Sequence, residues 1–148
     1  MTLSSMLSLH IITPAQPIFV GQVSSVSLPT PDGEITVLPR HIPLVSIVSP
    51  GTILVRPTRK TELLFAVSRG VIQVDGKRVR ILADTADRAE ELEEKEVQAA
   101  KLRAQALLKE RRGDVEGFAE ATAILERELA RLQVVRRRRR QRPLPGNV

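Results

Sequence analysis

The sequence predicts an α+β protein in which a domain of short β-strands precedes two helices. Eight of the ten prolines lie before residue 83, where they separate short runs rich in Val, Ile, Ser and Thr. Residues 83–135 contain no proline and consist largely of Ala, Glu, Leu, Lys and Arg, which favour helices. Short strands at regular intervals are typical of a sandwich or a barrel. We therefore expect a β domain followed by a helical one.

Alternating apolar residues mark the first strands. Leu7, Leu9 and Ile11 alternate with polar neighbours, which predicts a strand that ends at Thr13-Pro14, and a second strand is predicted over Val20–Leu28. From Leu28 to Gly51, five prolines and two glycines interrupt the chain, so the strands there must be short. Further strands are predicted at Glu34–Leu38, Val45–Val48, Thr52–Arg56 and Glu62–Val67.

The clearest local signal is a β-hairpin over Val71–Leu82. Asp75-Gly76 stands between two alternating runs, and this dipeptide suits the positive φ angles of a type I′ turn. Val79 and Ile81 should then face the core. The intervening basic residues should be solvated or at the sheet edge, namely Lys77, Arg78 and Arg80.

The apolar period changes to that of helices after Leu82. The first helix carries apolar residues at intervals of three and four (Val97, Ala100, Ala104, Leu107), and so does the second (Phe118, Ala121, Leu125, Leu129, Leu132). Between them, Gly113 suits a left-handed position after a helix end and Asp114 can cap the next helix. The short connection predicts an antiparallel pair. Because the first stripe is rich in alanine, we expect this pair to be marginally stable alone.

The patterns that catalysis or cofactor binding requires do not occur. The chain has no cysteine, and His10 and His41 lack a spaced carboxylate cluster that would complete a metal site. No glycine-rich phosphate loop follows a strand, and no base accompanies Ser24, Ser25 or Ser46. Without Trp or Tyr and with three Phe, the chain is a poor platform for stacking single-stranded nucleic acid. We expect no catalytic residue, no metal and no cofactor.

The net charge of +6 comes from the C-terminal end. Arg136–Arg140 and Arg142 supply six positive charges, and the other 17 Lys and Arg balance 17 Asp and Glu. No apolar stretch approaches the roughly 20 residues that cross a bilayer. The first residues lack the basic leader and cleavage site of a signal peptide. We expect a soluble or peripheral protein.

Four segments of the sequence are similar to one known family. They are LHIITPAQPIFVGQVSSVSLPT, DGEITVLPRHIPLVSIVSPG, FAVSRGVIQVDGKRVRILADTADRAEEL and ERELARLQV. With these segments in order, the chain resembles the epsilon subunit of bacterial F-type ATP synthases over nearly its whole length. The resemblance implies a ten-stranded β-sandwich over residues 1–85, an antiparallel two-helix hairpin over residues 86–140, and a disordered tail over residues 141–148.

The same resemblance implies the function and the partners. Family members carry no catalytic residue and belong to the rotating central stalk, where the sandwich packs on the gamma subunit and on the membrane rotor ring of c subunits. The hairpin can extend along gamma to the alpha and beta subunits of the catalytic head and block ATP hydrolysis. The resemblance places the chain at the cytoplasmic face of the bacterial plasma membrane, attached through the complex, with no specific nucleic-acid partner.

Matching positions suggest contact residues. Gly33-Glu34 and Pro39-Arg40-His41 match the ring-facing end of the family, so the resemblance implies ring contacts by Glu34, Arg40 and His41. Basic residues of the second helix meet the catalytic head in the family, which implies that role for Arg127, Arg131 and Arg136. Each assignment has an alternative that requires no partner. Glu34 would be a solvated strand end, His41 would have no function, and the arginines would complement the helix dipole.

The ATP-binding motif of some family members is degenerate here. The pattern [I/L]-D-x-x-R-A corresponds to Leu92-Glu93-Glu94-Lys95-Glu96-Val97, so a carboxylate replaces the arginine. Asp87 and Arg103 match outlying positions of that nucleotide site, as Leu92 and Glu93 match its start. Because a carboxylate repels phosphate where a guanidinium would bind it, we expect no regulatory ATP.

The arginine run leaves a competing interpretation open. A small β-domain protein whose arginine-rich tail binds nucleic acid or an anionic membrane would show the same run. Five adjacent arginines on a helix point all round it and form no single groove-facing stripe. In the family-based hypothesis, the run instead strengthens the contact of the hairpin with the catalytic head. Co-purification with gamma and the rotor ring, rather than with RNA, distinguishes the two.

Overall fold

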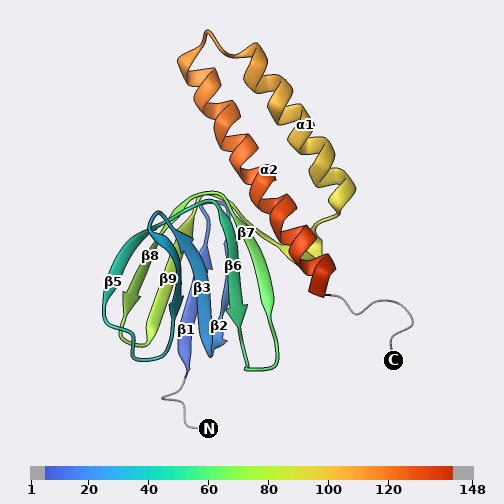
Figure 1. The fold of residues 1–148 in the computed structure, drawn as a ribbon. Coiled ribbons are helices and arrows are strands. Elements are labelled where there is room, and N and C mark those ends of the chain that lie inside the picture. Colours follow the sequence, from blue (N-terminus) through green and yellow to red (C-terminus); the bar gives the residue numbers. More distant parts are fainter. Residues whose placement is uncertain (1–5, 142–148) are drawn as a thin grey trace, which may run out of the picture.

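Ten strands in two sheets precede two helices in this computed structural model, which describes residues 6–141 (Figure 1). One sheet, here called the β1 sheet, has the order β2-β1-β9-β8-β5, and the other, the β6 sheet, has the order β10-β7-β6-β3-β4. The strands are β1 (Leu7–Ile12), β2 (Pro17–Val23), β3 (Ser25–Thr30), β4 (Gly33–Val37), β5 (Leu44–Val48), β6 (Gly51–Arg56), β7 (Leu63–Val67), β8 (Gly70–Asp75), β9 (Arg78–Ala83) and β10 (Ala86–Arg88).

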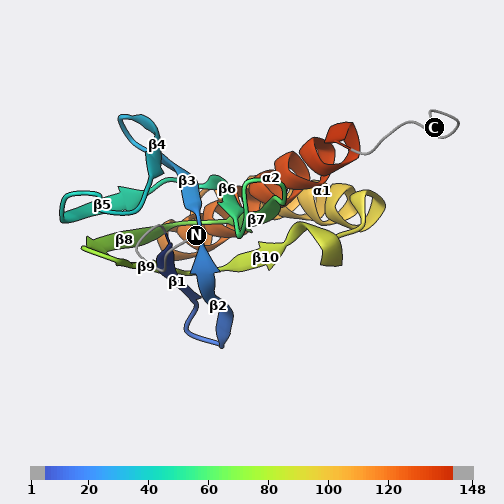
Figure 2. The same ribbon diagram turned by 90° about the horizontal axis from the view of Figure 1, so that it is seen from below.

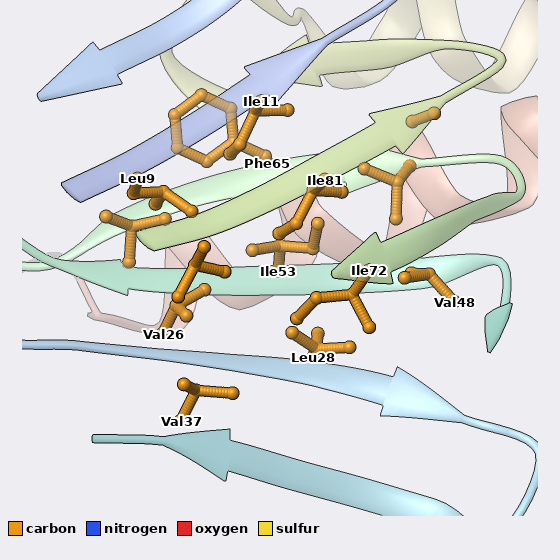
Figure 3. Packing of buried hydrophobic residues seen from close by; sticks show 14 of the residues in the cluster. Leu9, Ile11, Val26, Leu28, Val37, Val48, Ile53, Phe65, Ile72 and Ile81 are labelled. Atoms are coloured by element: carbon orange, nitrogen blue, oxygen red, sulfur yellow. The ribbon is translucent and has the colours of Figure 1, made fainter. Parts of the chain in front are cut away.

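The interior between the sheets is apolar, as the alternation predicted. Leu7, Leu9 and Ile11 of β1 are fully buried, and so are Val79 and Ile81 of β9, while Lys77, Arg78 and Arg80 are exposed. Figure 3 shows side chains of both sheets meeting in this layer, with Phe65 beside Ile11 and Ile72 beside Leu28. The predicted sandwich is therefore confirmed, and the barrel alternative is wrong.

The predicted single strand over Val20–Leu28 is two strands in different sheets. The chain leaves the β1 sheet at Val23 and enters the β6 sheet at Ser25. At the crossing, both the backbone N–H and the hydroxyl of Ser24 donate to the carbonyl of Arg56, at 2.7 and 2.8 Å. A serine hydroxyl thus stabilises a corner at which no glycine or proline stands.

The Asp75-Gly76 hairpin exists, but its turn differs from the predicted type I′. Asp75 pairs with Arg78 across the strands, so the two loop residues are Gly76 and Lys77. Only Gly76 has a positive φ, +58°. A glycine with positive φ at the first loop position is typical of type II′, and this turn also matches the twist of a hairpin.

The helical part begins with a short 3₁₀ turn, η2 (Ala89–Glu91), followed by α1 (Glu94–Glu110) and α2 (Val115–Gln141). The predicted antiparallel hairpin is confirmed, and Figures 1 and 2 show its two helices side by side. Gly113 does not take the predicted left-handed conformation. Arg111 caps the end of α1, and its N–H donates to the carbonyl of Leu107. Phe118 and Leu129, which belong to the predicted apolar stripe of the second helix, are 42% and 46% exposed.

Only part of the hairpin rests on the sandwich. α2 contacts β6, β7 and η2, and α1 packs on α2 (Figure 1). At about 1.5 Å per residue, α2 is about 40 Å long. Figure 1 shows its first half projecting past the sheets. The proposed division at residue 85 stays a prediction; β10 pairs with β7 as far as Arg88. The predicted tail, apart from Gln141 at the end of α2, lies outside the described residues.

Candidate interaction sites

The contact between α2 and the sandwich has a small apolar centre. β6 and β7 are apolar on both faces, because Ile53, Val55 and Phe65 point inward while Leu54 and Leu64 point outward. The outward side chains meet small residues of η2 and α2, and Leu92 packs at the edge. The buried members of this cluster are Leu54, Leu64, Ala66, Ala89, Ala130 and Val134. A strand in which apolar and polar residues do not alternate is predicted to be buried on both faces. The sequence interpretation did not use this signal.

Charged side chains surround this apolar centre. Arg127 donates from Nε and Nη2 to the two carboxylate oxygens of Asp87, at 3.3 and 3.2 Å. The Nε atom of Arg131 lies 3.5 Å from the same carboxylate. Nη1 of Arg131 donates to both oxygens of Glu128, at 2.9 and 3.0 Å. Glu128 is only 5% exposed, so Arg131 balances a buried charge.

Further pairs extend the contact in both directions along α2. Arg69, in the β7–β8 connection, donates from Nε and Nη2 to Glu126 at 3.2 and 2.8 Å. This hydrogen-bonded carboxylate raises the pKa of Arg69 above its ordinary value. Arg138 donates to the carbonyl of Ala89 at 3.2 Å. On the side of α1, Nε of Arg136 lies 3.7 Å from Glu94.

The structure brings two of the three predicted head-contact arginines together. At about 100° per residue, Arg127, Arg131 and Arg138 share one side of α2, whereas Arg136 lies on the opposite side and faces α1. We call Arg127, Arg131 and Arg138 the arginine seam. Each contacts an acceptor in the preceding part of the chain or in its own helix. Their contact with a catalytic head stays a prediction.

Beyond the seam, the hairpin and the sandwich separate. An open cleft of about 590 Å³ lies between the first half of α2 and the loops at Arg69 and Asp84. Its apolar lining includes Phe118 and Ile124, which are 42% and 39% exposed. The hairpin is therefore held mainly through the part of α2 from Glu126 onward.

The three predicted ring contacts do not share one end of the sandwich. Glu34 stands at the beginning of β4, beside the turn at residues 31–32, whereas Arg40 and His41 follow the end of β4. A five-residue strand spans about 17 Å, so Glu34 and His41 flank β4 at its two ends, and their contact with a rotor ring stays a prediction. Arg40 adopts φ 69°, and the N–H of His41 donates to the carbonyl of Leu38 at 3.1 Å. Pro39 followed by a positive φ is the pattern of a type II turn.

The outward face of the β1 sheet carries an apolar row that the sequence interpretation missed. The registers place Ile47 beside Val71, Val71 beside Leu82, and Leu82 beside Ile12. Ile47, Val71 and Leu82 are 59%, 43% and 50% exposed, and the adjoining Val45 is 71% exposed. We call these five residues the apolar row. An exposed contiguous apolar patch marks an interaction surface, and apolar residues on both faces of β5 and β9 could have predicted it.

The predicted nucleotide residues do not form a phosphate cradle. Asp87 is held by the arginine seam, Arg103 is exposed on α1, and Leu92 packs into the apolar clusters beside α2. Leu92 and Glu93 line an open cavity of about 480 Å³. The charged residues lining it are Glu90, Glu93, Glu94, Lys95 and Arg138. With three carboxylates against two cations, this cavity does not favour phosphate.

Within residues 6–141, no group of three or more His, Asp or Glu side chains is placed to hold a metal ion. None of the helices in this part of the chain is long and apolar enough to cross a membrane.

Comparison with known proteins places the chain in a family. Residues 6–89 match the model of the ATP synthase delta/epsilon chain β-sandwich domain. The ATP synthase epsilon chain of Alkalilimnicola ehrlichii is 36% identical over 137 residues, which is 93% of this chain and 97% of the relative. That of Herpetosiphon aurantiacus is 36% identical over 133 residues, covering 90% and 96%.

Two solved structures support the fold. A chain of the Euglena gracilis mitochondrial ATP synthase structure with OSCP, F1 and c-ring has a TM-score of 0.70 at 20% identity and covers 88% of this chain and 81% of its own. A chain of the Tetrahymena thermophila mitochondrial ATP synthase central stalk and c-ring has a TM-score of 0.52 at 16% identity and covers 82% and 99%. With the domain match and the near full-length relatives, these results show that this chain belongs to the ATP synthase epsilon chain family.

Proposed function

We propose that this chain is the epsilon subunit of an F-type ATP synthase, a non-catalytic rotor subunit of the central stalk that couples the membrane ion rotor to the catalytic head. The observation that carries the proposal is the near full-length match to epsilon chains, at 36% identity over 93% of the chain. The structures with similar folds are of ATP synthase assemblies that contain F1 or the central stalk together with the c-ring. The partners are therefore gamma and the c-ring.

The apolar row is the proposed gamma-docking surface. It lies on the outward face of the β1 sheet, while the outward face of β6 and β7 is already covered by α2. Burial of side chains that are about half exposed stabilises an interface by roughly 25 cal/mol per Å² of apolar area. We expect gamma to present an apolar surface of its own that packs against the apolar row and buries it.

A substitution in the apolar row tests this docking. Val71→Lys should reduce co-purification with gamma severalfold, because a charge at the centre of the row must be desolvated on docking. Gln22→Lys is the matched control, since Gln22 is exposed on the same face of the β1 sheet but lies on the edge strand β2, apart from the apolar row. Circular dichroism should show both variants folded. Equal recovery of gamma with both variants would contradict the assignment.

Glu34, Arg40 and His41 are proposed ring contacts at two alternative ends of the sandwich. Because the chain contains no cysteine, Glu34→Cys and His41→Cys each introduce a unique cross-linking site. We expect one of the two variants to cross-link to a cysteine in the polar loop of the c subunit, and that variant identifies the ring-facing end. If neither cross-links in the assembled enzyme, the ring contact lies elsewhere on the sandwich.

The helical hairpin is the proposed regulator of ATP hydrolysis. In this structure it is docked, and we propose that it extends to bring Arg127, Arg131 and Arg136 to the alpha and beta subunits. Removing residues 93–148 should then raise ATP hydrolysis by the assembled enzyme. Removing residues 136–148 should do so more strongly at low salt, because salt screens the arginine run. Unchanged hydrolysis with both truncations at every ionic strength would exclude the regulatory role.

Three finer points remain parts of the proposal. The subunit performs no chemistry of its own, it binds no regulatory ATP, and it is held peripherally at the cytoplasmic face of a bacterial membrane through its complex. Calorimetric titration with ATP tests the second point, and micromolar affinity would overturn it. No described contact favours the nucleic-acid alternative for the arginine run, because Arg136 and Arg138 contact Glu94 and Ala89 of the same chain.

A further inference from the structure

The docked arginine seam is occupied by a carboxylate of its own chain. Asp87, at the end of the sandwich, accepts two hydrogen bonds from Arg127 and lies 3.5 Å from Arg131. Its side chain is only 18% exposed. Arg127 and Arg131, which the proposed function assigns to the catalytic head, are therefore engaged while the hairpin is docked.

The balance of charge changes when the hairpin leaves. In the docked arrangement, Arg127 and Arg131 face Asp87 and Glu128, so two positive charges meet two negative charges. Glu128 belongs to α2 and leaves with it, whereas Asp87 belongs to β10 and stays behind. The departing helix surface therefore lacks one negative charge, and Arg127 lacks the carboxylate that accepted its two hydrogen bonds. A bidentate carboxylate is the ligand that a guanidinium fork matches best.

The apolar part of the contact does not prevent this exchange. Four of its side chains belong to the sandwich and η2, and α2 contributes Ala130 and Val134. Alanine buries little area, so the apolar contact alone holds the helix weakly. The ion pairs then contribute a large part of the free energy difference between the docked and the released hairpin.

We propose that Asp87 is an internal competitor for the acidic surface of the partner: it occupies the arginine seam in the docked hairpin and must be replaced by a partner carboxylate on release. This inference deepens the proposed regulatory function and rests on it. The seam is thus a masked binding surface for an acidic protein segment. Its affinity for that segment is set partly by a residue of the sandwich that never contacts the partner.

The first experiment measures release in the isolated full chain. Two cysteines, introduced at exposed Asp32 in the sandwich and exposed Glu120 on α2, carry a fluorescence donor and acceptor. Hexaglutamate serves as the acidic probe. Asp87→Asn should lower the hexaglutamate concentration at half release about fivefold, the upper end for a single partly exposed ion pair. Asp87→Glu, which keeps the charge, should stay near the unsubstituted chain.

The matched control removes the same charge elsewhere. Asp75 is the last residue of β8, and Asp75→Asn should leave the half-release concentration unchanged. If Asp87→Asn and Asp75→Asn behave alike, the competition is refuted. Release by sodium chloride but not by hexaglutamate at equal ionic strength would also refute it, because the seam would then bind no carboxylate in place of Asp87.

A second experiment separates this inference from the proposed function. In the assembled enzyme, Asp87→Asn should strengthen inhibition of ATP hydrolysis severalfold relative to Asp75→Asn. If removal of residues 93–148 does not change hydrolysis, the regulatory function fails even where the isolated chain shows competition. If that truncation activates the enzyme but Asp87→Asn leaves inhibition unchanged, the hairpin regulates and the competitor role of Asp87 is wrong.

Discussion

The interior of the sandwich and its contact with α2 are built from different side chains. The interior consists of buried aliphatic residues and Phe65. The α2 contact combines small alanines with Leu54, Leu64 and Val134, and ion pairs surround it. Apolar burial is not weakened by charge screening, whereas partly exposed ion pairs are screened by salt. The comparison indicates a permanent core and a contact that solution conditions and partners can release.

The largest expected effect lies in the interior. Ile53→Ala removes a fully buried side chain from the centre of the sandwich and should lower the free energy of unfolding by about 3 to 4 kcal/mol, since the cavity cannot collapse completely. Urea unfolding followed by circular dichroism measures the loss. Ile42→Ala is the control, because Ile42 is 75% exposed. A loss below about 1 kcal/mol would contradict the close packing of this layer.

A smaller and local effect is expected at the α2 contact. Val134→Ala removes two buried methyl groups and should weaken docking of the hairpin by about 1.5 kcal/mol. Amide hydrogen exchange of α2 should accelerate while exchange in β6 stays unchanged. Gln133→Ala is the matched control on the exposed neighbour. If both regions exchange faster in the Val134 variant, the sandwich and the hairpin unfold as one cooperative unit.

Salt should separate the two regions without a substitution. Raising sodium chloride to 1 M shortens the Debye length to about 3 Å, so the partly exposed pairs of Arg127 and Arg136 weaken. We expect faster amide exchange in α2 and unchanged exchange in β1 and β9. Equal protection of α2 at low and high salt would show that the alanine contacts alone hold the hairpin.

The smallest effect is expected at the ion pair between α2 and the sandwich whose arginine is the most exposed. Glu126→Gln removes the partner of Arg69, whose side chain is 63% exposed. Because water already solvates this guanidinium, exchange of α2 should change less than in Val134→Ala, and the change should vanish at 1 M salt. An effect as large as that of Val134→Ala would move the main attachment of the hairpin toward the β7–β8 connection.

Much of the fold could be predicted because local and global patterns agree. The alternation of Leu7, Leu9 and Ile11 needs only a period of two, and the two helices follow from a period of three to four. The resemblance added the number of strands, and residues 6–141 contain ten. The alternation and the helical period depend on residues close in sequence, so they can be predicted from the sequence alone.

The remaining differences depend on contacts distant in sequence. The corner at Ser24 requires the carbonyl of Arg56, and the arginine seam requires β10 to meet α2. Phe118 is exposed because the first half of α2 projects past the sheets, which no period reveals. The separation of Glu34 from His41 follows from the direction of β4. For the candidate sites, residue types were predictable, but their partners were not.

The parallel pairing of β1 with β9 has a consequence for synthesis of the chain. Ser8–Ile12 pairs with Arg78–Leu82, so the first strand lies between β2 and a strand some seventy residues later. Pairings of such long sequence separation slow folding, because the chain between the two strands must form a closed loop before their contacts can form. On the ribosome, the β1 sheet cannot be completed until residue 82 has left the exit tunnel. The edge of β1 stays open until then, and this nascent stage is where chaperones or aggregation would act.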